Sequence, residues 1–210
     1  MVAVHKIKEQ LTLNRPAYLG MCILDLSKTL MYDFHYNYIK KRYGSKAQLL
    51  FTDTDSLCYE IETEDIYADL WQDKHLFDNS DYPKDNEYFS TTNKKVIGKF
   101  KDESSSVPIT EFIGLRSKMY SCIKENQQVG KTAKGIKKNI IKNELKHINY
   151  KETLFDNKQL YHQMKTIRSQ NHQLASYELN KVSLSCYDDK RYLHENGISS
   201  YAYGHKSITQ

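Results

Sequence analysis

Apolar residues recur with helical spacing early in the chain. The members of this repeat are three or four positions apart: Leu19, Ile23, Leu26, Leu30, Phe34 and Tyr38. Such spacing places them on one face of an α-helix. Pro16 precedes the segment, Lys40-Lys41-Arg42 would complement the helix dipole at its end, and Gly44 follows. The pattern predicts one helix over residues 17–43, and we expect its apolar stripe to pack in a core.

Two short apolar runs come next and enclose an acidic turn. Leu49-Leu50-Phe51 precedes Thr52-Asp53-Thr54-Asp55-Ser56, and residues 57–61 follow. Because side chains alternate between the two faces of a strand, one face of the second run would be apolar. That face would hold Leu57, Tyr59 and Ile61. The pattern predicts a strand, a turn and a half-buried strand, with Asp53 and Asp55 at the tip.

The rest of the chain mixes both periodicities, which favours the α+β class. Residues 64–87 lose periodicity and indicate a surface excursion with one short helix near residues 66–71. Strand-like runs return at residues 95–100 and 109–113. Helical patterns cover residues 139–150 and 157–174, with Leu160, Met164 and Ile167 as core candidates. Alternation resumes at Val182, Leu184 and Cys186, before a turn-like segment over residues 187–192.

Length and composition exclude several classes of protein. The 210 residues could form one large domain or two small ones. No stretch approaches the roughly 20 apolar residues of a membrane span, and the first ten residues do not form a secretory signal. Cys22, Cys58, Cys122 and Cys186 lack Cys-x-x-Cys spacing, which disfavours a zinc site or a disulfide framework. We therefore expect no membrane partner and a reducing intracellular location, nucleus or cytoplasm.

Charge is distributed unevenly along the chain. The net charge is +5, but residues 53–87 carry 12 acidic and 2 basic side chains, and residues 88–146 carry 13 basic and 5 acidic ones. An acidic segment followed by a basic one suits a metal site beside a channel for a polyanion. Two separately solvated faces are the alternative interpretation.

The acidic turn and the basic segment offer different chemistry. Asp53 and Asp55 could share a hard divalent cation, because Mg²⁺ takes a few protein carboxylates and completes its shell with water and substrate phosphates. That chemistry indicates phosphoryl or nucleotidyl transfer, although an Asp-rich turn also forms for local reasons. Strand alternation would place Arg116, Lys118 and Tyr120 on one face, where they could contact phosphate, sugar or base. An exposed basic strand without a ligand is the alternative.

A second basic stretch contains Lys134 and Gly135. The glycine would permit close approach of the backbone to a ligand, or would serve only a turn. No P-loop and no Gly-x-Ser-x-Gly motif are found in the sequence.

Taken in order, these segments resemble the C-terminal part of a B-family DNA polymerase. The resemblance is closest to the protein-primed type found in certain viruses and in Polinton (Maverick) transposable elements, and it covers nearly the whole chain from about residue 11. Its central elements are Asp53-Thr54-Asp55-Ser56, similar to the third polymerase motif, and Glu111-Phe112-Ile113-Gly114-Leu115-Arg116-Ser117-Lys118-Met119-Tyr120-Ser121, similar to the Lys-x-Tyr element. Further matching segments are Asn14 to Gly20, Ile23 to Lys28, Met31 to Tyr36, Ala133 to Lys138, Val182 to Ser185 and Tyr187 to Tyr192.

The resemblance implies a fold and a set of roles. Residues 1–136 would form the later part of a palm, a long helix with an antiparallel hairpin and strands, and residues 137–210 a helix-rich thumb. Asp55 would be the essential ligand of two catalytic Mg²⁺ ions, with Asp53 as a supporting acid. Lys118 and Tyr120 would hold the primer strand.

By the same resemblance, Lys134 with Gly135 would approach the duplex backbone, and Arg116 would lie in the same DNA-binding element. The implied activity is template-directed DNA synthesis in DNA replication. The implied partners are primer–template DNA, deoxynucleoside triphosphates and a terminal protein as primer.

The chain also departs from the family pattern. The first polymerase motif, which carries the other principal metal-binding Asp, and the second motif, which holds the incoming nucleotide, are not found. We therefore expect a fragment that shares its Mg²⁺ with carboxylates outside this chain and is inactive in isolation. The alternative is a non-catalytic nucleic-acid-binding protein derived from a polymerase. A nuclease would need a further acid cluster, which the later sequence lacks.

Overall fold

The computed structural model describes residues 10, 12, 14–187, 191–196, 199–202 and 204–208. The chain divides into two compact units, one ending at Ile109 and the other starting at Thr110. Helices are mixed with antiparallel sheets, so the expected α+β class is confirmed. The palm and thumb assignment, with its boundary at residues 136 and 137, stays a prediction.

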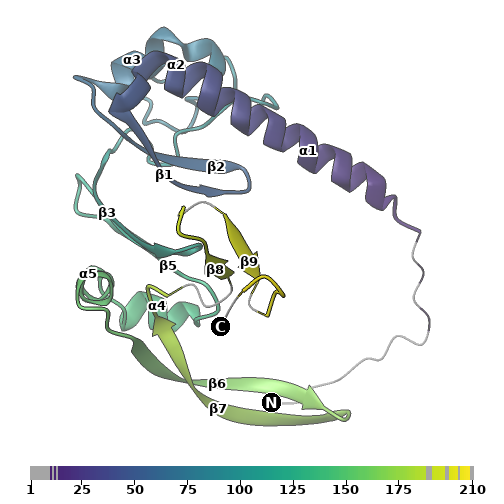
Figure 1. Cartoon of the computed structure of the whole chain (residues 1–210). Coiled ribbons are helices and arrows are strands. Elements are labelled where there is room, and N and C mark those ends of the chain that lie inside the picture. The colour runs from purple at the N-terminus through teal and green to yellow at the C-terminus, as the bar shows by residue number, and fades with distance from the viewer. Residues whose placement is uncertain are drawn as a thin grey trace. The chain divides into compact units, whose positions relative to one another are not determined.

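The first unit begins with the predicted long helix (Figure 1). It runs through α1 (Ala17–Asp33), the π-helical turn η1 (Phe34–Ile39) and α2 (Lys40–Tyr43), and ends in the short 3-10 turn η2 (Gly44–Lys46). Gly44 has φ +57, a conformation that glycine adopts without the cost of a Cβ. The predicted end of the helix is therefore confirmed.

The prediction that the whole apolar stripe packs in a core is wrong for α1. Leu19, Ile23 and Leu26 are 52%, 60% and 71% exposed, and no residue of α1 is buried. Burial begins in η1, where i→i+5 hydrogen bonding brings Phe34 and Ile39 to the same side. Only this end of the helix reaches the core of the first unit.

That core is a small aromatic and aliphatic cluster. Phe34 stacks on Phe100 with ring centroids 3.9 Å apart and meets the edge of Phe77 at 5.9 Å. Ile39 and Ala47 complete its buried part. The predicted apolar face of the second strand, with Leu57, Tyr59 and Ile61, packs against the same cluster, so that half-buried strand is confirmed.

The predicted short helix is α3 (Ile66–Gln72), followed by the 3-10 turn η3 (Lys74–Leu76). Arg42 of α2 donates hydrogen bonds to Asp69 at 2.8 Å and to Asp73. Tyr43 adds a hydroxyl donor to Asp69 at 3.0 Å. Because these groups are half-buried, their charge-assisted bonds fix α3 against α2 more firmly than an exposed pair would.

The strand predicted over residues 95–100 does not form. Lys95 and Gly98 have φ +59 and +84, which interrupt an extended backbone, and Ile97 is 99% exposed. Only Phe100 makes a single parallel bridge, to Phe77. The alternation of apolar residues here reflects turns around Asp78, not a strand.

Asp78 organises this turn region. Its carboxylate accepts hydrogen bonds from the backbone N–H groups of Ser80 at 3.0 Å and Lys95 at 3.1 Å, and Lys101 lies 3.4 Å away. Burial by itself raises the pKa of Asp78, but the hydrogen bonds from Ser80 and Lys95 and the charge of Lys101 outweigh it and lower the pKa to about 2.

The second unit starts with a three-stranded sheet of order β3-β4-β5. Its strands are β3 (Ile109–Arg116), β4 (Met119–Lys124) and β5 (Val129–Ala133). Two short helices follow, α4 (Lys138–Asn143) and α5 (His147–Phe155), where one helical pattern was expected over residues 139–150. The last elements are the long hairpin of β6 (Leu160–Gln170) and β7 (Gln173–Leu184), and the small pair β8 (Arg191–Leu193) and β9 (Ser200–Ala202).

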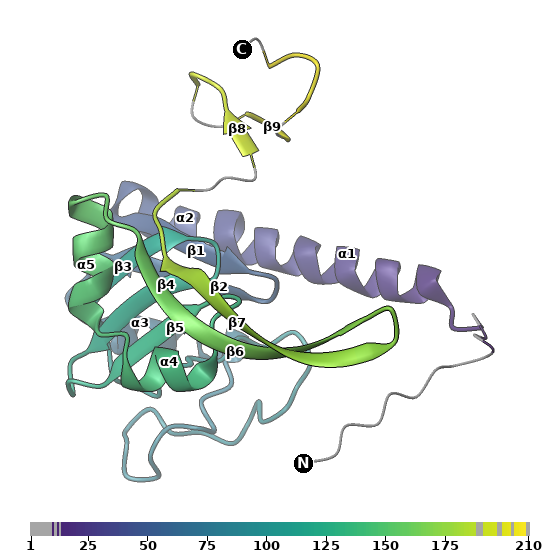
Figure 2. The ribbon, with the colours of Figure 1, turned by 90° about the horizontal axis from the view of Figure 1, so that it is seen from below.

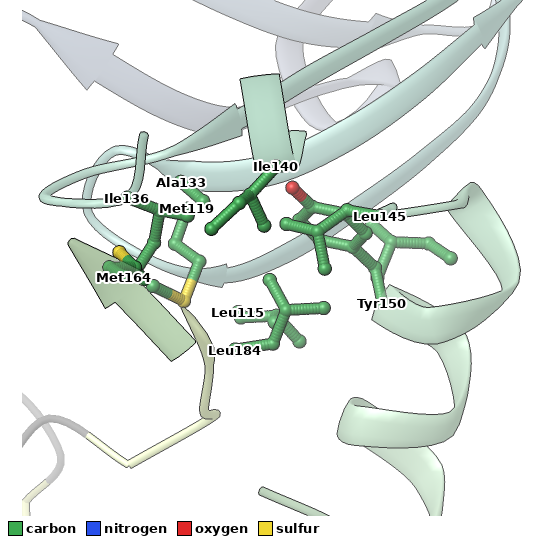
Figure 3. Close-up of a cluster of buried hydrophobic side chains, with 10 residues drawn as sticks. Leu115, Met119, Ala133, Ile136, Ile140, Leu145, Tyr150, Met164 and Leu184 are labelled. Atoms are coloured by element: carbon green, nitrogen blue, oxygen red, sulfur yellow. The ribbon is translucent and has the colours of Figure 1, made fainter. Parts of the chain in front are cut away.

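One apolar core holds the second unit together (Figure 3). Tyr150, Leu145 and Leu184 are at most 1% exposed and meet side chains from the sheet and from α4. The Tyr150 hydroxyl donates to the carbonyl of Thr132 at 3.2 Å, so the buried ring keeps a partner for its polar end. This core draws residues from both sides of position 136.

The helix predicted over residues 157–174 is wrong. Figure 2 shows β6 and β7 there as a long twisted ribbon. Asn171 and His172 form its two-residue loop with φ +48 and +64, as a type I′ turn requires. Met164 is buried but Ile167 is 58% exposed, so the spacing that suggested a helix does not mark one face.

The prediction that residues 137–210 are rich in helix is wrong for the same reason. In the described part of this range α4 and α5 are 6 and 9 residues long, whereas β6 and β7 are 11 and 12. The turn-like segment expected at residues 187–192 lies largely outside the described residues.

Among the described residues, no helix has both the length and the apolar character needed to cross a membrane. None of the four cysteines, all of which lie in the described part of the chain, forms a disulfide bond.

The lowered pKa of Asp78 predicts a pH dependence of stability. A carboxyl whose pKa falls on folding stabilises the fold above the unfolded pKa, near 4, and loses that contribution as the pH falls toward about 2. We expect Asp78→Asn to lower the free energy of unfolding by about 2 kcal/mol at pH 7 and by roughly half as much at pH 3. Urea unfolding of both proteins at pH 7, 5 and 3 measures this. A difference that stays constant over this range would contradict the assignment.

Candidate functional site

The acidic tip is the loop of the hairpin formed by β1 (Ala47–Asp53) and β2 (Ser56–Ile61). Asp53 pairs with Ser56 across the hairpin, so Thr54 and Asp55 alone make the turn. The pairing shifts register between Leu49 and Phe51, which marks a β-bulge in β1 shortly before the tip. Bulges of this kind re-aim the side chains that follow them.

The backbone of the tip adopts a strained conformation at Thr54. This residue has φ +58, and the N–H of Asp55 donates to the carbonyl of Asp53 at 2.7 Å. An i→i+2 bond around a central residue of positive φ is the rare, strained form of γ-turn. A β-branched side chain is especially unfavourable there. The Ser56 hydroxyl donates to the same Asp53 carbonyl at 3.3 Å and helps to hold the turn.

This turn presents two carboxylates at one end of the hairpin. Asp55 is exposed and Asp53 is half-buried, with the Thr54 hydroxyl 3.5 Å from an Asp53 carboxylate oxygen. An all-oxygen donor set fits Mg²⁺, but two carboxylates supply only part of the six oxygens that the ion requires. In the described ranges, no group of three or more His, Cys, Asp or Glu side chains could hold a metal ion. The tip can therefore serve as part of a metal site.

The predicted basic residues lie in the second unit, around the turn that joins β3 to β4. Arg116 ends β3, Tyr120 is the second residue of β4, and Lys118 lies in the turn with φ +57. The expected unbroken alternation from Arg116 to Tyr120 is therefore wrong, because the chain reverses at Ser117 and Lys118.

Lys118 and Lys134 lie together at one end of the sheet. The carbonyl of Lys118 accepts a hydrogen bond from the N–H of Lys134 at 3.0 Å, directly after the pairing of Met119 with Ala133. Both side chains are exposed. Two residues that are 16 positions apart in the sequence thus form one basic site.

Arg116 and Tyr120 have structural contacts of their own. The Arg116 guanidinium donates to the carbonyl of Tyr187 at 2.9 Å. The ring of Tyr120 lies 5.7 Å from that of Phe112, and its side chain is half-buried. Because a guanidinium has five N–H donors, Arg116 could bind a further acceptor while keeping this bond.

Gly135 forms the turn between β5 and α4. Its φ is +83, and a Cβ there would come within 3.0 Å of the Lys181 ammonium. Lys181, on β7, donates to the Gly135 carbonyl at 2.8 Å. The turn therefore requires glycine, and Lys181 joins Lys118 and Lys134 in the basic group. Sequence spacing gave no sign of Lys181, because 46 positions separate it from Gly135.

Comparisons with models of protein families, with curated proteins and with solved structures found no match to this chain. The acidic tip and the basic group each lie within one of the two units.

The strain at Thr54 predicts an unusual response to mutation. Asparagine tolerates the left-handed conformation better than threonine, so Thr54→Asn should raise the free energy of unfolding by about 1 kcal/mol. The matched control Thr52→Asn changes an exposed β1 residue of ordinary φ and should lower stability, because asparagine is a poor strand residue. Urea unfolding of the three proteins tests this. Loss of stability in Thr54→Asn would contradict a strained turn.

Proposed function

We propose that this chain is the C-terminal palm and thumb portion of a protein-primed B-family DNA polymerase, contributing to template-directed nucleotidyl transfer. The observation that carries the proposal is the tip itself. The Asp53-Thr54-Asp55-Ser56 segment resembles the third polymerase motif, and its backbone is strained at Thr54. Strain of this kind persists where the surrounding structure enforces it and is concentrated at functional sites.

The two carboxylates would act as metal ligands. Two bound Mg²⁺ ions would supply charge stabilisation for the attacking 3′-oxygen and the leaving pyrophosphate. Asp55, exposed at the turn, would be the principal ligand of this chain, and Asp53 would support it from the end of β1. The hydrogen bonds that converge on the Asp53 carbonyl would keep the two side chains in place.

The basic group in the second unit would hold the DNA. Lys118 and Lys134 are exposed ammonium groups at the same end of the sheet, suited to backbone phosphates. Tyr120 and Arg116 would add contacts to the primer strand, and Gly135 would let the turn approach the duplex. Contacts of this kind carry no sequence information, as a template-directed enzyme needs.

The remaining parts of the active site would come from elsewhere. The incoming deoxynucleoside triphosphate needs residues of a second motif, and the metals need the carboxylate of a first motif. We propose that a polypeptide carrying both completes the enzyme, and that a terminal protein supplies the primer.

A non-catalytic DNA-binding protein is the second candidate. One observation favours it. Contacts within a single unit bring Lys118, Lys134 and Lys181 together, whereas the two carboxylates of the acidic tip supply only part of a metal site. Such a protein would bind primer–template DNA through the basic group without needing Asp55.

DNA binding should be salt-sensitive and indifferent to sequence. Each phosphate contact adds close to one unit to the slope of log affinity against log salt, so Lys118→Ala should lower that slope by about one. Lys41→Ala, an exposed change on α2, is the control and should leave the slope unchanged. Fluorescence anisotropy on primer–template duplexes at several salt concentrations measures this. Tight binding that ignores salt, or that prefers one sequence, would count against the proposal.

Primer extension tests the catalytic assignment. The 210-residue chain alone should not extend a labelled primer, whereas the chain supplemented with an upstream segment carrying the first two motifs should. Asp55→Asn should then reduce the rate about a thousand-fold or more, equivalent to about 4 kcal/mol of transition-state stabilisation.

The matched control for that experiment is Asp85→Asn, which makes the same change at an exposed position of the acidic segment and should preserve the rate. Full activity of Asp55→Asn in the completed enzyme would refute the role of the tip. Robust synthesis by the chain alone would refute the expected dependence on an upstream half.

A further inference from the structure

A lysine-lined hollow of about 580 Å³ lies in the second unit, where β5 faces α4. Five lysines line it: Lys118, Lys131, Lys134, Lys138 and Lys142. No acidic residue is among its lining residues. The volume falls within the range typical of ligand sites, about 300–1,000 Å³.

The charge around the hollow is held at a cost to the free protein. Lys138 and Lys142 are four positions apart on α4, so they lie on one face of the helix, where their like charges repel and destabilise it. Within the part of the chain that the structure describes, neither of them nor Lys134 forms a salt bridge with a carboxylate. A bound polyanion would remove this repulsion.

Lys131 has a structural role. Its ammonium donates to the carbonyl of Lys142 in the last turn of α4 at 3.2 Å and to the carbonyl of Leu145, just after the helix, at 2.5 Å. Its charge is therefore bound by backbone, and burial lowers its pKa. Lys131 is a positioning residue, because it ties β5 to α4 and so fixes the two walls of the hollow.

Apolar side chains complete the lining. Val129 from β5, Ile136 from the following turn and Ile141 from α4 lie among the lysines. These apolar side chains offer a surface for the sugar of a nucleotide.

We propose that this hollow binds consecutive backbone phosphates of one strand of primer–template DNA, with Lys134, Lys138 and Lys142 as the phosphate ligands. This rests on the proposed function and extends its DNA contacts from the turn at Lys118 onto α4. A lysine ammonium is a compact donor that can bind phosphates in many orientations. A site that recognises the DNA backbone and not its sequence requires this property.

The two lysines of α4 should lower the thermal stability of the free protein and raise its affinity for DNA. In the double variant Lys138→Gln and Lys142→Gln the repulsion on α4 is gone, so the melting temperature without DNA should equal or exceed that of the unchanged protein. The slope of log affinity against log salt should fall by about two. The double variant Lys138→Arg and Lys142→Arg keeps both charges and should show the slope of the unchanged protein.

The experiment measures melting temperature without DNA and anisotropy on primer–template duplexes, for both double variants and for the control Lys41→Gln. Tripolyphosphate is added as a short competitor that carries the same phosphate chemistry without sugars. Competition that weakens in the glutamine variant supports the site. An unchanged salt slope in the glutamine variant, or a lowered melting temperature with no change in slope, overturns it.

The outcomes separate this proposal from the proposed function. Binding that depends on Lys118 but not on α4 would overturn the hollow and leave the polymerase proposal standing. Binding that depends on Lys138 and Lys142, with no primer extension in the completed enzyme, would support the hollow and count against the polymerase.

Discussion

Burial of apolar side chains around Tyr150 is the interaction on which the second unit depends. Its helices α4 and α5, of 6 and 9 residues, are too short to be stable alone, and its three-stranded sheet and its long hairpin lie on either side of them in the sequence. Packing Leu145, Ile140 and Leu184 into one core brings these elements together. The same packing holds several lysines of like charge close to one another, so hydrophobic burial supplies the free energy that keeps a basic surface assembled.

Local sequence signals predicted the elements whose structure is decided locally. The long helix, the turn between Asp53 and Asp55 and the strand from Ile109 all follow from spacing and from turn residues. These signals failed where the same spacing of apolar residues is compatible with both a helix and a strand. Leu160, Met164 and Ile167 fit a helix, but β6 and β7 pair along their whole length, and the apolar spacing gives no indication of the Asn171-His172 turn that joins them. Positive φ angles at Lys95 and Gly98 likewise broke an apparent strand.

In the candidate site, too, the features set by local sequence could be predicted and those set by tertiary contacts could not. The two carboxylates of the tip are close in sequence, so their proximity could be predicted, but the positive φ of Thr54 could not, because threonine normally avoids it. The basic group depends on tertiary contacts. Lys134 reaches Lys118 through strand pairing, and Lys181 reaches Gly135 from β7. Arg116 could be identified as a candidate, but its bond to the Tyr187 carbonyl could not.

The exposed helix α1 has a consequence for how the chain opens and closes locally. No residue of α1 is buried, so its amides are protected only by the helix's own hydrogen bonds, whereas η1 is anchored by Phe34 and Ile39. Local opening free energies follow burial and contact density. Hydrogen exchange should therefore be fastest at the first turns of α1 and slow progressively toward Phe34, so that one continuous helix spans a gradient of stability rather than behaving as a single cooperative element.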